Sequence, residues 1–267
     1  MMPIELIAAV RSGVAQVIVE RDRERVGSGS AFLVDGGIIT NSHNLRKVPY
    51  DALAIRFADT DAADPANYIR IVPDDCILAE SPEEEKDYAY LKLDEPEFSG
   101  RHVFEFCCSD KPLSVGEQVV FLGFPFGMSG MSQLTSHVGH VSSIHNQKDV
   151  EIIQIDGSVN GGNSGGPLID LTTGQVAGIV TRAVTGLIEE QFRNLICALR
   201  QNQEVCKRSQ GMMTMGFDLA QAIGASYAAM EQISRDLFRS ANVGIGYAYS
   251  ARYARDAVAS VRQRTST

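Results

Sequence analysis

The stretch QIDGSVNGGNSGGPL, residues 154–168, places Ser164 between two pairs of glycines. Glycine lets the backbone adopt a tight, exposed turn whose N–H groups are free to converge on one point. Such converging N–H groups form an oxyanion hole, and each donor contributes about 3 to 4 kcal/mol to transition-state stabilisation. Because a serine is a weak nucleophile by itself, this interpretation requires a general base and an acid that orients the base.

The order of residues along the chain separates the classes of hydrolase that use such a serine. The same segment also fits the Gly-x-Ser-x-Gly elbow of α/β-hydrolases, in which the histidine follows the serine. Here every histidine precedes Ser164, which excludes that order. A papain-like site also fits poorly, because the glycine-rich turn presents a serine where the nucleophilic cysteine would be. The orders His–Asp–Ser and Asp–His–Ser both remain open. The histidines are His43, His102, His137, His140 and His145.

Two residues upstream fit the roles of base and orienting acid. His43 directly follows the strand-like run Ile38-Ile39-Thr40, where the end of a strand holds an imidazole rigidly. Asp87 opens the apolar run DYAYLKL, where a partly buried carboxylate fixes the tautomer of a neighbouring imidazole. The sequence therefore predicts a His43–Asp87–Ser164 constellation.

The hydrophobic pattern predicts an all-β fold up to about residue 185. Short runs rich in β-branched residues alternate with turn-forming clusters, as in a sandwich or barrel, and regular helices between the strands are missing. This favours the His–Asp–Ser order. Beyond Gly186 the period changes to that of amphipathic helices, predicted near residues 188–199 and 219–238 with an irregular connection over 201–216. A last strand over 243–249 and a helix over 251–262 follow.

Composition excludes several functions. The chain has 267 residues with 24 Lys+Arg against 33 Asp+Glu, and a net charge of -9 disfavours nucleic-acid binding. No apolar run is long enough for a membrane helix, and the N-terminus lacks a secretory pattern, so a cytoplasmic location is expected. No cofactor is expected, and no metal site, since the ligand spacings of zinc are missing. The scattered cysteines, Cys76, Cys107, Cys108, Cys197 and Cys206, do not suit a disulfide framework.

Six further motifs, taken in order, resemble those of chymotrypsin-fold serine proteases, and the HtrA (DegP-like) branch is the most similar. The resemblance runs from about residue 4 to 185 and resumes at about 242. Each motif is weak alone, whereas the ordered set is specific. The motifs are GSGSAFLVDGGIITNSH (27–43), DYAYLKL (87–93), GFPFG (123–127), VGHVSS (138–143), GQVAGIVT (174–181) and NVGIGYAYSARYARDAV (242–258).

The resemblance implies two six-stranded antiparallel β-barrels with the site in the cleft between them. The chain is expected to form a single protease domain over 1–267, in which the first barrel covers about 1–110 and the second covers 111–185 plus 242–250. A helical insertion over 186–241 and a C-terminal helix and tail over 251–267 complete the expected organisation. That branch usually carries a leader or anchor and a PDZ domain, and neither is expected here.

The resemblance also implies roles for individual residues. Ser164 is the nucleophile, His43 the general base and acid, and Asp87 the orienting carboxylate. Gly162, Asn163 and Ser164 form the oxyanion-hole segment. Asn163 replaces the aspartate that pairs with a new N-terminus in digestive relatives, so activation by N-terminal cleavage is not expected and loop ordering is the alternative.

The same resemblance implies a neutral substrate pocket for small or medium aliphatic P1 side chains. Ser158 stands where trypsin-like enzymes carry an acidic residue, and Arg182 either faces solvent or favours acidic residues near the cut. The expected pocket residues are Ser158, Val159, Val180, Thr181, Arg182 and Ala183.

The expected function is that of a serine endopeptidase acting on protein or peptide substrates through an acyl-enzyme, either directly or after a partner switches it on. The insertion is the expected site for such an activator or partner, although an apolar helical face more often packs on its own domain. The competing hypothesis is a protease-fold scaffold whose insertion recruits partners with little or no catalysis.

Overall fold

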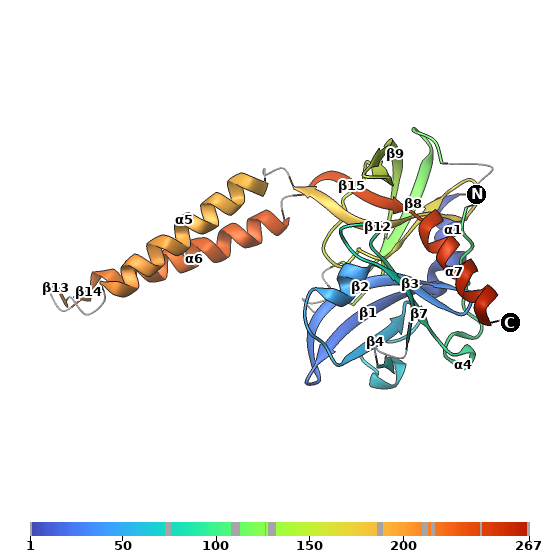
Figure 1. The fold of residues 1–267 in the computed structure, drawn as a ribbon, viewed down its shortest axis with the longest axis horizontal. Helices are drawn as coiled ribbons and strands as arrows, with labels where there is room; N and C mark the ends of the chain where they lie inside the picture. Colours follow the sequence, from blue (N-terminus) through green and yellow to red (C-terminus); the bar gives the residue numbers. More distant parts are fainter. Residues whose placement is uncertain are drawn as a thin grey trace. The chain divides into compact units, whose positions relative to one another are not determined.

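The computed structural model describes residues 2–72, 76–107, 113–125, 127, 132–185, 189–209, 213–214, 217–240 and 242–265. The chain forms two compact units. The main unit comprises Met1–Ala183 and Gly244–Thr267, and the hairpin unit comprises Val184–Val243. Each unit is described by itself below, and the elements of both are labelled in Figure 1.

The first sheet of the main unit has seven strands in the order β5-β4-β1-β2-β3-β7-β6, each antiparallel to its neighbours. The first seven residues of the interior strand β1 are buried, because both faces of this strand are covered. Ala15, Val17 and Val19 alternate along β1 and pack into the core of this sheet. The strands are β1 (Val14–Arg21), β2 (Glu24–Val34), β3 (Gly37–Thr40), β4 (Ala52–Phe57), β5 (Ile69–Ile71), β6 (Ile77–Ser81) and β7 (Tyr88–Lys92).

The second sheet is a closed barrel in the order β10-β15-β12-β11-β8-β9, which confirms the prediction of a six-stranded barrel for this half. A separate apolar core that includes Phe121, Ile155 and Val180 fills it. The hairpin unit joins β12 to β15, which are neighbours in the barrel. The strands are β8 (Gln118–Gly123), β9 (Thr135–Gln147), β10 (Val150–Ile155), β11 (Pro167–Asp170), β12 (Val176–Thr185) and β15 (Asn242–Ser250).

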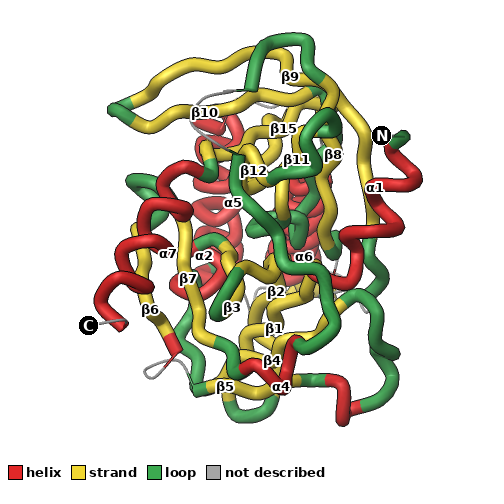
Figure 2. The backbone as a smooth tube through the Cα atoms, turned by 90° about the vertical axis from the view of Figure 1, so that its right-hand side faces the viewer, coloured by secondary structure: helices red, strands yellow, loops and turns green. Residues whose placement is uncertain are grey.

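A third apolar core joins the two sheets of the main unit. Phe32 from β2, Phe124 after β8 and Ile179 from β12 are all buried in it. Helix α7 contributes Ala254 and Val258 to the same core, and Figure 2 shows α7 running along β6 and β7. The helical elements of the main unit are α1 (Pro3–Val10), η1 (Arg11–Gly13), α2 (Ser42–Arg46), η2 (Pro65–Asn67), α4 (Glu95–Phe98) and α7 (Arg252–Thr265).

The prediction of a six-stranded barrel for the first half needs correction. Its seven strands form an open sheet, and within the described residues the edge strands β5 and β6 do not pair with each other. Strand β5 has only three residues, so it can form few backbone hydrogen bonds with a further strand. The register of β6 against β7 is interrupted between Ile77 and Ala79, and such an irregularity twists an edge strand away from further pairing.

The hairpin unit contains two long helices, α5 (Glu189–Arg208) and α6 (Leu219–Ser240), and the short pair β13 (Met213–Thr214) and β14 (Phe217–Asp218) between them. The prediction of an irregular connection over 201–216 is wrong for its first half, since α5 continues through Arg208. Its Gln, Glu, Lys and Arg residues favour helix. Two of its side chains also meet α6: Gln203 donates to Glu231 at 3.0 Å, and Cys206 lies against Gly224.

Candidate functional site

Strand pairing in the first sheet brings His43 and Asp87 together. Strands β3 and β7 are antiparallel with Thr40 opposite Ala89, so the end of β3 lies beside the start of β7. His43 follows β3 in helix α2, and Asp87 directly precedes β7. Both side chains are buried, with 6% and 1% of their surfaces exposed.

Two hydrogen bonds, one from the imidazole and one from the backbone, join His43 to the carboxylate of Asp87. His43 Nδ1 lies 2.7 Å from Asp87 Oδ2, and the backbone N–H of His43 donates to Asp87 Oδ1 at 3.0 Å. Because an ionised carboxylate can only accept, the proton of the neutral imidazole sits on Nδ1 and leaves Nε2 as a free base. This is the tautomer that a general base for Ser164 requires.

Further buried contacts hold Asp87 ionised and in place. Burial raises its pKa, but hydrogen bonds and charge from His43, together with a hydrogen bond from Thr181, outweigh this and lower the pKa of Asp87 below its usual value. Thr181 Oγ1 donates to Asp87 Oδ2 at 2.9 Å. Asn41 Nδ2 donates to the backbone oxygen of Asp87 at 2.6 Å, where the backbone has a φ of 47°.

Ser164 lies in the loop between β10 and β11, and residues of the first sheet and α2 hold that loop. The backbone oxygen of Ser164 accepts from the N–H of Ser30 at 2.8 Å and from Asn44 Nδ2 at 2.9 Å. Ser30 Oγ donates to the oxygen of Gly162 at 2.7 Å. Gly165, with a φ of 89°, packs so closely that an added Cβ would lie 2.1 Å from the oxygen of Ser30. The serine loop is therefore held against β2 and against α2, the helix that contains His43.

The hydroxyl of Ser164 points to a backbone acceptor in this structure. Ser164 Oγ donates to the carbonyl oxygen of Thr181 at 2.6 Å. Strand β12 therefore contacts two members of the constellation through one residue, since the side chain of Thr181 binds Asp87 and its carbonyl binds Ser164.

The segment before Ser164, expected as an oxyanion hole, forms a tight turn. The N–H of Asn163 donates to the oxygen of Asn160 at 3.0 Å, and Gly162 at the third position has a φ of 103°. A positive φ at that position alone defines a type II turn and favours glycine. Among the described residues, the N–H groups of Gly162 and Ser164 donate to no other backbone group and are available to a ligand.

Asn163 is fully buried between these two N–H groups, packed against Gly123. Neither Oδ1 nor Nδ2 of its side chain has a hydrogen-bond partner in the described part of the chain.

The residues expected to line a substrate pocket do not all face one space. Val159 and Val180 are buried in the barrel core, at 2% and 0% exposure, whereas Ser158 is exposed. Thr181, expected as a pocket wall, directs its hydroxyl to Asp87 instead. The side chains of Arg182 and Ala183 lie outside what the structure describes.

Sequence reasoning missed the residues that position the constellation. Ser30, Asn41 and Asn44 occur within or directly after the motif GSGSAFLVDGGIITNSH, but their side chains act on partners that lie 46 to 132 residues away. A small polar residue inside an otherwise apolar strand, as Ser30 is in β2, is the available signal, because a buried hydroxyl needs a partner.

Neither a metal centre nor a membrane helix emerges from the described residues. No group of three or more His, Cys, Asp or Glu side chains among them is placed to hold a metal ion. None of the helices formed by these residues combines the length and the apolar character needed to cross a membrane.

Comparison with known proteins identifies similar sequences over most of the main unit. The trypsin-like peptidase domain family matches residues 27–179. A probable periplasmic serine endoprotease DegP-like of Pseudomonas fluorescens is 31% identical over 168 residues, which cover 62% of this chain and 31% of that protein. Protease Do-like 5, chloroplastic, of Arabidopsis thaliana is 29% identical over 189 residues, covering 68% of this chain and 56% of the relative.

Solved structures show the same fold. The HtrA-type protease AlgW with tripeptide has a TM-score of 0.60 at 19% identity, covering 98% of this chain and 64% of that one. The serine endoprotease from Yersinia pestis has a TM-score of 0.54 at 21% identity, covering 69% and 58%. This chain spans between about a third and just over half of the length of the two sequence relatives. Their names place them in the periplasm and the chloroplast, and the cytoplasmic location expected for this chain stays a prediction.

Proposed function

Because the chain belongs to the trypsin-like peptidase domain family, we propose that it is a serine endopeptidase of the HtrA/DegP kind that cleaves peptide bonds. In this proposal Ser164 attacks the scissile carbonyl while Nε2 of His43 takes its proton, and Asp87 stabilises the imidazolium that forms. The N–H groups of Gly162 and Ser164 bind the oxyanion. His43 then protonates the leaving amine, and water repeats the sequence on the acyl-enzyme.

One observation carries this proposal: the buried contact of 2.7 Å between His43 Nδ1 and Asp87 Oδ2, which leaves Nε2 unprotonated. Burying a carboxylate is costly unless it is hydrogen-bonded. Asp87 accepts from His43 twice and from Thr181 once. A buried, fully bonded carboxylate that fixes one imidazole tautomer is the arrangement that general-base catalysis needs.

The hydrogen bond from Ser164 to Thr181 does not favour an inert scaffold. A typical hydrogen bond contributes about 0.5 to 1.5 kcal/mol net, so rotating Ser164 Oγ away from the Thr181 carbonyl reduces the competent population by about 2- to 10-fold. Family members accelerate peptide hydrolysis by far larger factors. The bond therefore attenuates activity, and complete latency would require a larger rearrangement of β12 or of the serine loop.

Activity-based labelling tests the proposed chemistry directly. A fluorophosphonate probe should modify one residue of the full chain, Ser164, and peptide mass spectrometry identifies it. Absence of label on Ser164 at neutral pH, with or without added protein partners, would support the scaffold hypothesis instead.

We further propose a neutral pocket that prefers small or medium aliphatic P1 residues. Ser158 supports this proposal, because it provides no carboxylate where trypsin-like enzymes use one to bind Lys or Arg. A peptide-library profile should therefore favour Val, Ala or Ile at P1 over charged residues by at least about 100-fold, since an unpaired buried charge costs several kcal/mol.

The variant Ser158→Asp should shift this preference toward Arg and Lys at P1. The side chain is exposed, so the new carboxylate costs little stability and can pair with a basic P1 residue. The measurement is the ratio of kcat/KM for matched Val and Arg peptides, with Asn146→Asp, at an exposed position near the end of β9, as a control of equal charge. An unchanged ratio in Ser158→Asp would mean that position 158 does not contact P1.

A further inference from the structure

The two helices of the hairpin unit expose a set of large apolar side chains. Seven of the thirteen large hydrophobic side chains that are exposed in the described residues belong to α5 and α6, which concentrates them in the smaller unit. We call these seven the apolar face. They are Leu195 (48% exposed), Val205 (62%), Leu219 (56%), Ile223 (39%), Met230 (53%), Ile233 (58%) and Leu237 (59%).

The spacing of these residues shows that both helices present them on the same side. On α6 the positions 219, 223, 226, 230, 233 and 237 alternate steps of four and three, the heptad pattern of a helix that packs along another helix. On α5 the positions 195, 198, 202 and 205 do the same.

The position of each exposed row of residues relative to the contact between α5 and α6 shows on which side of the hairpin unit that row lies. The contact uses positions 196, 199, 203 and 206 of α5 and 224, 227 and 231 of α6, since Ile196 and Leu199 are buried and Gln203 binds Glu231. Each exposed stripe lies one residue before these positions, which is a rotation of about 100° in the same sense. In an antiparallel pair, equal rotations from the contact lead to the same side, so the two stripes form one surface.

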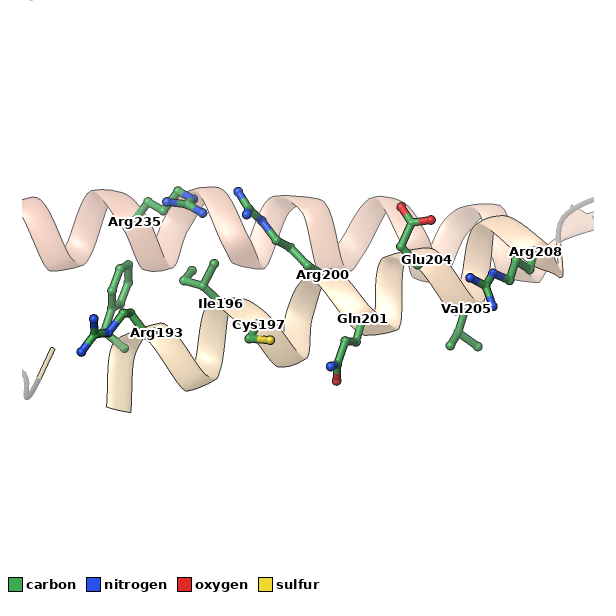
Figure 3. A pocket seen from close by; sticks show the side chains of 10 residues that line it. Arg193, Ile196, Cys197, Arg200, Gln201, Glu204, Val205, Arg208 and Arg235 are labelled. Carbon is green, nitrogen blue, oxygen red and sulfur yellow. The ribbon is translucent and has the colours of Figure 1, made fainter. Parts of the chain in front are cut away.

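Charged side chains line a groove along α5 that Val205, alone among the seven apolar residues, also lines. Arg193, Arg200, Glu204 and Arg208 of α5 line a groove of about 720 Å³ with Arg235 of α6 (Figure 3). Arg200 and Arg235 both pair with Glu231 there. The positions between the seven apolar residues are filled by Ala198, Asn202 and Ser226, so the apolar face includes no charged residue.

We propose that the apolar face binds the same face of a second copy of this chain, forming an antiparallel four-helix bundle. Helices of about 20 residues are about 30 Å long, and two of them side by side are about 20 Å wide. The contact would bury about 600 Å² per copy and about 1,200 Å² in total, the lower end of specific protein interfaces. A four-helix bundle packs four helices through residues at heptad spacing, and one copy of the hairpin unit would supply two of these helices.

Charge favours a second copy over a charged partner protein. The hairpin unit has six basic and six acidic residues and is neutral, so the net charge of -9 belongs to the main unit. In a contact with two-fold symmetry each surface meets itself, and like charges near the axis would repel. A neutral unit whose apolar face has no charge is suited to such pairing. This inference does not depend on the proposed peptidase activity.

The oligomeric state of the full chain tests the proposal. We expect a dimer by sedimentation velocity at micromolar concentration. The double variant Met230→Glu/Ile233→Glu should raise the dissociation constant by at least about 100-fold, because a buried unpaired charge is strongly unfavourable. The control variant Gln201→Glu/Gln221→Glu adds the same two charges at exposed positions outside the apolar face and should remain dimeric.

Circular dichroism measures whether the double variant keeps its helices. We expect it to do so, because both substituted residues are more than half exposed and the contact between α5 and α6 is left intact. If the double variant loses helicity, the milder Met230→Gln/Ile233→Gln variant should still weaken the dimer. A monomeric wild-type chain overturns the proposal, and so does an oligomer that the double variant leaves unchanged. A monomer whose melting temperature falls in the double variant would show that the chain covers the apolar face itself.

Discussion

Replacing Ser164 with alanine should lower kcat by about 10⁶-fold, because the nucleophile and its base act as a unit and loss of either removes nearly all of their joint contribution. The substitution removes one hydroxyl whose hydrogen bond goes to the carbonyl of Thr181. The contacts of the Ser164 backbone with Ser30 and Asn44 remain, so the loop keeps its conformation. Stability should change by less than about 1.5 kcal/mol, the net contribution of one hydrogen bond.

The measurement is hydrolysis of an internally quenched peptide by the wild type and the variant at equal concentration, with thermal melting to check folding. Ser99→Ala, at an exposed serine after α4, is the matched control and should leave kcat unchanged. A residual rate of about 10³- to 10⁴-fold over water should persist, because the oxyanion hole and substrate binding remain. Hydrolysis by Ser164→Ala at the wild-type rate would show that another residue is the nucleophile.

The contact between His43 and Asp87 could be predicted from sequence, because each candidate residue sits at a position that local patterns reveal. Ser164 stands in a glycine-rich turn, His43 follows a strand, and Asp87 precedes one. Chain order then removed the alternatives in which a histidine follows the serine. The antiparallel pairing of β3 with β7 then brings the end of one strand beside the start of the other.

The positioning residues could not be predicted, because their partners are distant in the chain. Thr181 was expected to line a substrate pocket, and the strand that contains it was predicted. The direction of its hydroxyl depends on how β12 packs against the first sheet. The residues that neighbour Thr181 in the sequence do not indicate that packing. The open first sheet and the full length of α5 were missed for a related reason, since edge pairing and helix–helix contacts are long-range effects.

Replacing Asp87 with asparagine should lower kcat by about 10⁴-fold while leaving the fold intact. The carboxylate accepts the Nδ1 proton of His43, whereas the amide nitrogen of asparagine is a donor. An amide nitrogen facing Nδ1 forces the proton onto Nε2, so the imidazole can no longer accept the proton of Ser164. The measurement is kcat for a cleavable peptide, and a loss smaller than tenfold would mean that Asp87 does not set the tautomer.

Asp149→Asn is the matched control for this variant. Asp87 and Asp149 both adopt a positive φ, 47° and 64°, which asparagine also tolerates, so backbone strain is the same for both substitutions. Asp149 is exposed on the turn between β9 and β10, away from His43. We expect its substitution to leave kcat and the melting temperature unchanged, and a similar loss in both variants would point to backbone strain rather than lost chemistry.

The pH dependence of stability separates the electrostatic role of Asp87 from its packing. The pKa of Asp87 is lowered in the folded chain, so its ionised form stabilises the fold at pH values above the unfolded pKa of about 3.9. That contribution is lost as the pH falls through the folded pKa. The free energy of unfolding of the wild type should therefore decrease on acidification below about pH 4, and Asp87→Asn should lose less over the same interval, because asparagine does not titrate. Denaturant titrations of both proteins from neutral to acidic pH measure this difference, and parallel curves would show that the carboxylate contributes no net charge stabilisation to the folded site.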